Sequence, residues 1–526
     1  MKSRTLAATL LGLSLTIAQS SFAPVQAEEK IKFTPAFVQA TMTEAALQNA
    51  IAEIDKLAQK QIDNNVVPGL AISIVHNDKV VFAKGYGVRE VGKPEKIDAD
   101  TVFQLASISK AVAATVVASV VGDKTITWDS KISDLDPAFA LNDPYVTSNL
   151  TVRDLFAHRS GLPSHAGDVL EDMGYEQAEI LHRLRYQRPN TSFRSSYAYT
   201  NFGLTEGSLA AAKAAKNSWE SLSEERLYKP LGMDSTSSRY SDFAGRANKA
   251  MGHVLVGGKY VHKKQRTPDP QTPAGGVSSS VNDMAKWMRL QIGAGKFEGK
   301  QVVDEKALGE THRPHMMTAY SPVTGLPDYY GLGMNVSYDK NGRLILGHSG
   351  GFVTGAATNV RMVPVEKLGI CVLTNAAPVG APEGLAATFT DLALYGKSSQ
   401  DWLALFGSVF ADPTTLGETV GHYGKAVKSP QPASPVSAYV GTYENDFYGQ
   451  VKISEANGNL TVKLGPTLTA PLKHYDRDTF TYEVVTEDLS GVNGVTFAIG
   501  GDGKAISVLV DNLNEFGQGL FTRSLH

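Results

Sequence analysis

Three short motifs, widely separated in the chain, carry residue types that together could transfer an acyl group. They are Ser107-Ile108-Ser109-Lys110, Tyr199-Thr200-Asn201 and His348-Ser349-Gly350. Acyl transfer through serine needs a nucleophilic hydroxyl, a base that accepts its proton, and groups that hold the substrate. The three motifs offer a hydroxyl, an amine, a phenol, an amide and an imidazole. One motif alone would mean little, but the set predicts a nucleophilic serine site.

The first motif lies where a buried helix is expected to begin. Residues 111–121 are rich in alanine and valine, which predicts a buried helix that starts at or near Ser107. Free backbone N–H groups and the positive end of the helix dipole could stabilise an oxyanion there, and Lys110 returns to the same face one turn later. Serine is a common helix cap, so most isolated Ser-x-x-Lys matches have no function. The apolar surroundings of Lys110 favour a functional role, because a buried ammonium is costly unless it serves a partner.

The other two motifs supply the remaining groups. Tyr199 and Asn201 lie in a loop that enters a predicted helix over 205–215. A tyrosine near an ammonium could be partly ionised and take the serine proton, while the Asn201 amide donates to a substrate carbonyl. His348 follows the strand-like run 344–346 and could donate hydrogen bonds or a proton to the substrate. Taken singly, each is better explained as a packed aromatic, a turn asparagine or a core histidine.

The elements that must position these residues come from both ends of a long segment. Residues 43–64 have the apolar period of an amphipathic helix, and 69–88 reads as a hairpin of two strands. Helical patterns follow, including 110–121 and 281–292. A second group of strands is expected over 330–338, 343–347, 355–363 and 368–375. We therefore expect an α+β fold, in which one antiparallel sheet is flanked by helices and a helical lobe, with the site where sheet meets lobe.

The chain is expected to contain two folded domains. Residues 428–437 contain Pro430, Pro432 and Pro435, a composition that favours an extended linker. The first domain would then cover 28–427. Residues 438–526 alternate short β-rich runs with glycine- and asparagine-containing turns, which is typical of a small all-β barrel.

The amino terminus, residues 1–27, reads as a secretory signal peptide. It has Lys2 and Arg4, a short apolar run over 6–18, and small residues at 25–27 for cleavage. We expect an exported protein, periplasmic or secreted, and no stable membrane insertion after cleavage, because the apolar run is shorter than the roughly 20 residues that span a bilayer. The single cysteine, Cys371, excludes an intrachain disulfide and is expected to be buried in a strand.

Composition and local motifs argue against several classes of function. A formal net charge of -3 gives no reason to expect nucleic acid as a partner. The local spacing patterns of zinc and calcium sites are missing, so neither a metal nor another cofactor is expected. Gly347-His348-Ser349-Gly350-Gly351 fits the nucleophile elbow of α/β-hydrolases, which would make Ser349 the nucleophile, but no helical period follows it. Residues 87–93 approximate a phosphate loop, but Pro94 replaces the required hydroxyl residue, so we expect a turn.

In order and type, the three motifs match a known family. The chain resembles the serine β-lactamase and penicillin-binding-protein superfamily, nearest the branch of class C β-lactamases, D-alanyl-D-alanine carboxypeptidases and carboxylesterases. The resemblance covers roughly residues 43 to 400. It is supported by Gly85-Tyr86-Gly87, Thr151-Val152-Arg153-Asp154-Leu155, His158-Arg159-Ser160-Gly161-Leu162-Pro163 and Gly275-Gly276-Val277-Ser278-Ser279. The tail resembles the lipocalin-like barrel appended to some members, where it could shape substrate access or assembly.

The resemblance implies a β-lactamase-like fold and a role for each motif residue. Ser107 would be the acylated nucleophile, and Lys110 and Tyr199 its base system. The implied substrate-binding residues are Asn201, His348, Ser349 and Gly350, and the backbone N–H groups of Ser107 and Gly351 would form the oxyanion hole. Efficient class C β-lactamases carry Lys-Thr-Gly where this chain has His348-Ser349-Gly350, a pattern similar to peptidases and esterases of the same branch.

The predicted function is hydrolysis of an amide or ester through an acyl-enzyme on Ser107, without a metal or cofactor. A small-molecule or peptide substrate is expected: a peptide, a D-amino-acid derivative, a β-lactam or a small ester. Two alternatives use the same site. One is a penicillin-binding sensor or scaffold with little or no turnover, and the other is an acyltransferase whose acceptor is not water.

Overall fold

The computed structural model describes residues 41–321, 324–411 and 423–524. The predicted signal peptide, 1–27, lies outside the described residues. Within them, no helix combines the length and the apolar character that crossing a bilayer requires.

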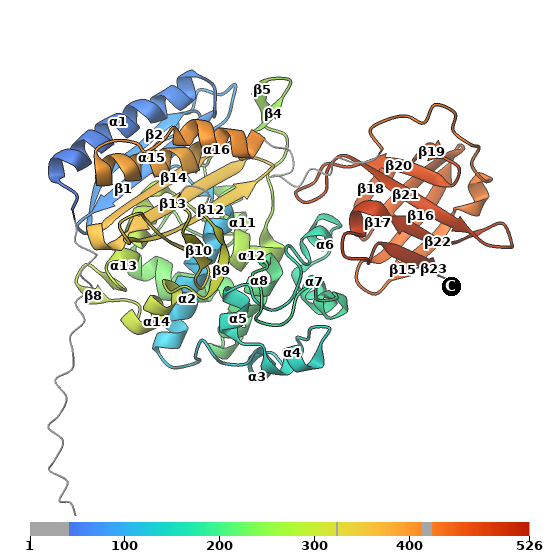
Figure 1. Cartoon of the computed structure of the whole chain (residues 1–526), viewed down its shortest axis with the longest axis horizontal. Helices are drawn as coiled ribbons and strands as arrows, with labels where there is room; N and C mark the ends of the chain where they lie inside the picture. The colour runs from blue at the N-terminus through green and yellow to red at the C-terminus, as the bar shows by residue number, and fades with distance from the viewer. Residues whose placement is uncertain (1–40, 322–323, 412–422, 525–526) are drawn as a thin grey trace, which may run out of the picture.

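One eight-stranded antiparallel sheet organises the larger domain (Figure 1). Its strands, in spatial order, are β2 (Lys79–Gly87), β1 (Gly69–His76), β14 (Leu368–Thr374), β13 (Ala356–Val363), β12 (Leu344–Phe352), β11 (Asn335–Tyr338), β10 (Pro327–Tyr330) and β9 (Met316–Tyr320). The first strand of this sheet in sequence therefore pairs with its last, so that β1 lies against β14 with Ile72 opposite Val372, and β2 pairs with β1 at the edge. Nearly every residue of β1 and β14 is buried, because helices cover both faces of the sheet.

The two faces of the sheet are covered by different helices. One face carries α1 (Glu44–Asp63), α15 (Ala381–Tyr395) and α16 (Trp402–Ala411), and the other carries α2 (Ser109–Gly122) and α13 (Val281–Ile292) (Figure 1). Helix α1 presents Leu47, Ile54 and Ala58 to the first face, as its amphipathic period predicts. Helix α2 is buried from Ser109 to Val120, because its sequence carries apolar residues on all sides. It is the central helix onto which the lobe packs.

A helical lobe stands below the sheet in Figure 1. It contains α3 (Ile132–Leu135), α4 (Pro144–Asn149), α5 (Val152–Phe156), α6 (Asp168–Asp172), α7 (Gln177–Arg183), α8 (Asn201–Ala214), α9 (Trp219–Ser223), α12 (Thr272–Gly275) and α14 (Glu305–Thr311). Helices α8, α12 and α14 pack against α2. The buried carboxylate of Asp154 holds part of the lobe together, because it caps α5 through Thr151 and pairs with Arg159 and Arg194.

The carboxy-terminal domain is a nearly closed, nine-stranded antiparallel barrel. Its spatial order is β18 (Leu468–Pro471), β17 (Asn459–Leu464), β16 (Gly449–Ala456), β15 (Gly441–Asn445), β23 (Leu520–Arg523), β22 (Ala505–Val510), β21 (Val492–Ile499), β20 (Thr479–Glu483) and β19 (Lys473–Asp476). Strand β18 lies beside β20, which brings the two ends of the sheet together. Side chains such as Val451, Val462 and Val495 fill the interior in alternation with exposed residues. The predicted fold class is confirmed in both domains.

Two strand predictions need correction. The predicted strand 330–338 is two antiparallel strands, β10 and β11, because the chain turns at 331–334, where Gly333 has φ +72°. The predicted strand 343–347 continues to Phe352, so that His348-Ser349-Gly350 lies inside β12. Cys371 is buried in β14, as predicted. Residues 87–93 turn at the end of β2, which agrees with the assignment of the phosphate-loop match to a turn.

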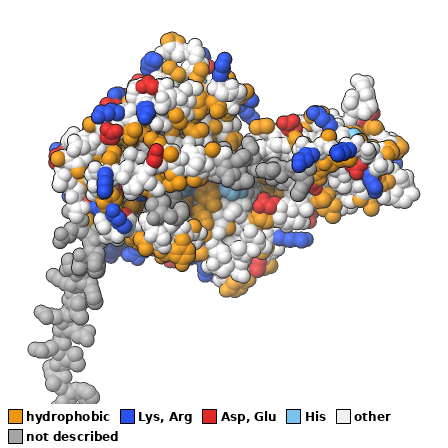
Figure 2. All heavy atoms as spheres, turned by 45° about the horizontal axis from the view of Figure 1, so that its top comes forward, with side chains coloured by type: hydrophobic (Ala, Val, Ile, Leu, Met, Phe, Trp, Pro, Cys, Tyr) orange, Lys and Arg blue, Asp and Glu red, His pale blue; other side chains and the backbone are white. Residues whose placement is uncertain are grey.

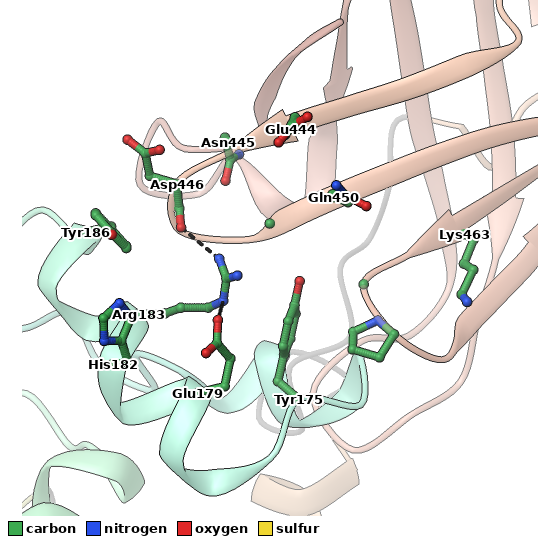
Figure 3. A pocket seen from close by; sticks show the side chains of 13 residues that line it. Tyr175, Glu179, His182, Arg183, Tyr186, Glu444, Asn445, Asp446, Gln450 and Lys463 are labelled. Carbon is green, nitrogen blue, oxygen red and sulfur yellow. Dashed lines mark hydrogen bonds and ion pairs between the residues drawn. The ribbon is translucent and has the colours of Figure 1, made fainter. Parts of the chain in front are cut away.

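The barrel packs against the helical lobe beside α6 and α7 (Figure 1). Arg183 of α7 donates to the backbone carbonyl of Asp446 at 2.8 Å and pairs with Glu179, and Tyr175 donates to the carbonyl of Tyr448 (Figure 3). A hollow of about 570 Å³ remains between these elements. The proposed linker, 428–437, contains no strand. The boundaries of the two domains on either side of it stay a prediction.

Candidate active site

Ser107 lies in a tight turn that leads directly into α2. The turn, η1 (Ala106–Ile108), runs into α2 at Ser109. Ala106, immediately before the serine, has φ +48°, a left-handed conformation that is unfavourable for alanine. It is held there by burial and by its packing on Phe352 of β12 and on Ala356. Ser107 itself is half-buried and lines a cavity of about 280 Å³.

Lys110 is completely buried directly behind the serine. Its Nζ donates to Oγ of Ser107 at 3.1 Å and to the backbone carbonyl of Ala274 at 3.0 Å. Burial lowers the pKa of Lys110 from 10.5 to about 7, because a dry environment disfavours the ammonium. Nearby Asp168 partly opposes this shift by electrostatic attraction. Both protonation states are therefore populated near neutral pH, which is the condition for accepting and returning a proton.

Tyr199 contacts both the serine and the lysine. Its hydroxyl donates to Oγ of Ser107 at 2.8 Å, and the Lys110 Nζ lies 4.5 Å from its ring centroid. Burial raises the pKa of Tyr199 well above its ordinary value of 10. The expectation of a partly ionised phenol is therefore wrong, because the cost of burying a phenolate exceeds the benefit of the neighbouring amine. In this arrangement Lys110 is the group better able to accept a proton, and Tyr199 is a neutral hydroxyl that can donate one.

Asn201 begins α8, two residues after the tyrosine. Its Nδ2 donates at 2.6 Å to the Oδ2 of Asp168, while its Oδ1 is buried without a hydrogen-bond partner. The predicted donation to a substrate carbonyl would use the second hydrogen of the same amide. Asp168 in turn contacts the imidazole of His165, with 2.8 Å between Oδ2 and Nδ1. Asn201 thus links the serine region to an acidic group of the lobe.

Strand β12 forms the other wall beside the serine. A Cβ placed on Gly350 would lie 2.8 Å from the backbone N of Ser107 and 2.3 Å from the carbonyl oxygen of Leu105, so only glycine allows this close approach. Gly351 is exposed at the end of the same strand and lines the cavity. The Oγ of Ser349 accepts a hydrogen bond at 3.0 Å from Nδ2 of Asn359, which lies opposite it on β13. Because Ser349 lies within a strand and not at a turn into a helix, the nucleophile-elbow alternative does not apply.

His348 is buried in the cavity wall and is neutral. Its ring nitrogens lie 2.9 Å from the hydroxyl of Tyr330 and 2.5 Å from the carbonyl oxygen of Ser349. Burial, with a smaller effect of Lys110, lowers the pKa of His348 to about 3. An imidazole that is neutral at physiological pH is a poor source of protons, so the suggested donation of a proton to the substrate is not supported. Its hydrogen bonds instead position Tyr330 and the strand.

Several residues of the cavity were not identified from sequence. Tyr197, Tyr330 and Phe410 form aromatic walls, and Glu383 of α15 lies behind Ser349. Burial raises the pKa of Glu383 to about 7. His158 packs on Tyr199 with 4.7 Å between ring centroids and accepts from the backbone N–H of Thr200. Of these, only His158 had a sequence signal, since it lies in one of the stretches that carried the family resemblance.

The arrangement as a whole fits covalent catalysis by serine. A hydroxyl contacts an amine that can be neutral and a phenol that can donate, and it opens to a small cavity. The backbone N–H groups of Ser107 and Gly351 lie on two elements that meet at this point.

Known families and relatives match most of the chain. A family model described as beta-lactamase matches residues 54–395, and one described as a domain of unknown function, DUF3471, matches 425–521. The chain is 24% identical over 479 residues to "Unguisins hydrolase ungD" of Aspergillus violaceofuscus, covering 82% of this chain and 83% of that protein. It is 25% identical to "Beta-lactamase-like protein 2" of Dictyostelium discoideum, covering 82% and 78%.

A similar fold is found in the octameric penicillin-binding protein homologue from Pyrococcus abyssi. That structure aligns with a TM-score of 0.58 and 20% identity, covering 88% of this chain and 98% of the other. The similarity therefore extends over both domains and concerns the fold.

Proposed function

Because this chain belongs to the β-lactamase family, we propose that it is a serine hydrolase that cleaves an amide or ester through an acyl-enzyme on Ser107. The observation that carries the proposal is the pair of contacts on one hydroxyl: Lys110 Nζ at 3.1 Å and Tyr199 OH at 2.8 Å. The relatives support a hydrolase of this type, and one of them is named as a hydrolase of unguisins.

In the proposed acylation step, neutral Lys110 takes the Ser107 proton as Oγ bonds to the substrate carbonyl carbon. The carbonyl oxygen becomes an oxyanion held by the backbone N–H groups of Ser107 and Gly351. As the carbonyl re-forms, the bond to the leaving group breaks, and Tyr199 supplies that group with a proton that Lys110 replaces. Water then attacks the ester along the reverse proton route and releases Ser107.

The cavity favours a small acyl group that carries no carboxylate. Among the described residues that line it, neither lysine nor arginine occurs, and aromatic side chains form three of its walls. Its volume of about 280 Å³ is small for a ligand site. An anionic substrate would meet Glu383 there, whereas the amine of Lys110 lies behind Ser107 and does not line the cavity. We therefore propose small neutral esters or amides, ahead of β-lactams that carry a carboxylate.

The proposal can be tested with a fluorophosphonate probe and chromogenic substrates. Purified protein should be labelled and should hydrolyse short-chain p-nitrophenyl esters faster than a chromogenic cephalosporin. Ser107→Ala should lose labelling and turnover at a stability cost of about 1–3 kcal/mol, because Lys110 Nζ and Tyr199 OH lose a shared acceptor. Ser349→Ala is the matched control and should still be labelled. Labelling that survives in Ser107→Ala would refute the proposal, and stable labelling without ester turnover would favour the sensor alternative.

A further inference from the structure

The barrel inserts a short acidic loop into the edge of the active site. The loop, residues 484–491, connects β20 to β21 and contains Glu487 and Asp488. Asp172 of α6 holds it by accepting hydrogen bonds from the Thr486 hydroxyl at 2.6 Å and from the Asp488 backbone N–H at 2.8 Å. Glu487 accepts from the backbone N–H of Val353, the residue after β12. The loop therefore contacts both the lobe and the strand that lines the serine cavity.

This junction gathers five carboxyl groups around one arginine and one histidine. The carboxyl groups of Asp168, Glu171 and Asp172 come from α6, and those of Glu487 and Asp488 come from the barrel. Arg266 pairs with two of them, Glu171 at 3.0 Å and Glu487 at 3.1 Å. Asp168 and Asp488 are left facing His165. On the face shown in Figure 2, histidine and acidic side chains are visible in the hollow where the two domains meet.

Three carboxyl oxygens in this group are buried without a partner. They are Oδ1 of Asp168, whose side chain is 1% exposed, Oε2 of Glu487 and Oδ2 of Asp488. Buried carboxyl oxygens normally accept hydrogen bonds, so leaving them unsatisfied costs free energy. One donor atom each from His165, Asp168 and Asp488 lies within 4.8 Å of the others. A bound cation would satisfy the unpaired oxygens of Asp168 and Asp488.

We propose that His165, Asp168 and Asp488 bind one divalent transition-metal ion, of the Zn²⁺ or Mn²⁺ type, which ties the barrel to the lobe beside the serine. One imidazole and two carboxylates suit these ions better than Ca²⁺, which takes six to eight oxygen ligands. Ligand atoms around a tetrahedral ion at about 2.1 Å stand about 3.4 Å apart, so the side chains must close by up to about 1.4 Å. The His165 side chain, which is 58% exposed, has the freedom to do so.

The metal would act on the serine region through Asn201. Asp168 already holds the Asn201 amide through Oδ2, so an ion bound at Oδ1 would fix both the asparagine and the acidic loop. His165 and Asp168 are three residues apart, but the third ligand, Asp488, comes 320 residues after Asp168. This explains why a search for local ligand spacings could not detect the site.

Calorimetry and thermal unfolding of the full chain test the proposal directly. Protein freed of metal with EDTA should bind Zn²⁺ or Mn²⁺ with a stoichiometry of one ion per chain, and its Tm should rise. Asp488→Asn should weaken binding at least about tenfold. His165→Asn should do the same, and asparagine tolerates the φ of +60° at this position. Asp502→Asn, in an exposed turn of the barrel, is the matched control and should bind as the wild type does.

The stability of the metal-free proteins provides a second test, in which Asp488→Asn is not expected to be impaired. Without metal, Asp488→Asn should be at least as stable as the wild type, because it removes a buried charge beside Asp168 and Asp172. A lower Tm for that variant would assign the carboxyl a structural role and overturn the proposal. So would the absence of saturable binding, or equal affinity in both variants and wild type. Fluorophosphonate labelling of Ser107 reports the hydrolase function separately, so failure of one proposal does not mimic failure of the other.

Discussion

The buried amine of Lys110 makes a quantitative prediction about stability and pH. Replacing it by methionine keeps the length of the side chain and removes the ammonium. With a pKa of about 7 in the folded chain against 10.5 ordinarily, the burial penalty is about 4 kcal/mol at pH 7 and about 2 kcal/mol at pH 9. An amine whose folded pKa is depressed binds more protons when unfolded. Its penalty is therefore full below pH 7 and fades as the pH rises toward 10.5.

Urea unfolding of wild type and Lys110→Met at both pH values measures this difference. The variant loses the hydrogen bonds to Ser107 and Ala274, but that loss changes little with pH. Its stability relative to wild type should therefore fall by about 2 kcal/mol between pH 7 and pH 9. Lys306→Met removes an exposed lysine of α14 and should show no such dependence. A difference that stays constant from pH 7 to pH 9 would refute the depressed pKa.

The same amine should set the pH dependence of acylation. The rate of fluorophosphonate labelling should follow the neutral fraction of Lys110, which falls about fiftyfold between pH 7 and pH 5 when the pKa is about 7. Labelling should level off above pH 8. A profile that keeps rising toward pH 10 would mean that a group with an ordinary pKa, and not Lys110, accepts the proton.

Three further substitutions test other parts of the site. Tyr199→Phe should keep the fold but slow ester hydrolysis about 10²- to 10⁴-fold, and an unchanged rate would remove the hydroxyl from the proton route. Gly350→Ala should abolish labelling and lower the free energy of urea unfolding by about 1–3 kcal/mol, because its Cβ would lie 2.3 Å from a backbone oxygen. Gly309→Ala is the control and should be tolerated, because nothing lies within 4 Å of the added Cβ. Asp154→Asn should lower the stability measured by thermal unfolding by about 3–5 kcal/mol, because two arginines lose a buried partner. Asp129→Asn is the control and should cost under about 1 kcal/mol, because the Asp129 side chain is 67% exposed.

Local pattern predicted the elements best where one periodicity dominated. The amphipathic period of 43–64 and the apolar run of 111–121 correspond to α1 and α2. The run 330–338 was predicted as one strand although Gly331 and Gly333 interrupt its strand composition, and the backbone turns there to pack against α14 and α2. The two glycines were the signal for this turn, and the contacts with neighbours distant in sequence show why the chain turns at that place.

Electrostatics of the site was harder to predict, because it depends on burial. Sequence indicated that a tyrosine and a lysine would lie near the serine, and the structure has both in contact with it. It could not indicate which of them would be the base. That depends on complete burial, which lowers the pKa of Lys110 to about 7 and raises that of Tyr199. The same burial leaves His348 neutral.

The sequence by itself determined the family, the two-domain fold class and the chemical groups of the three motifs, because these depend on residue type and short spacing. Only the tertiary structure decided which groups meet. It brought Gly350 against the backbone of Ser107 and placed Asp488 of the barrel beside Asp168 of the lobe. It also gathered the aromatic side chains that line the cavity. The physical reason is that hydrogen bonding, desolvation and charge act over a few ångströms in space, and residues hundreds of positions apart can share that distance only once the chain has folded.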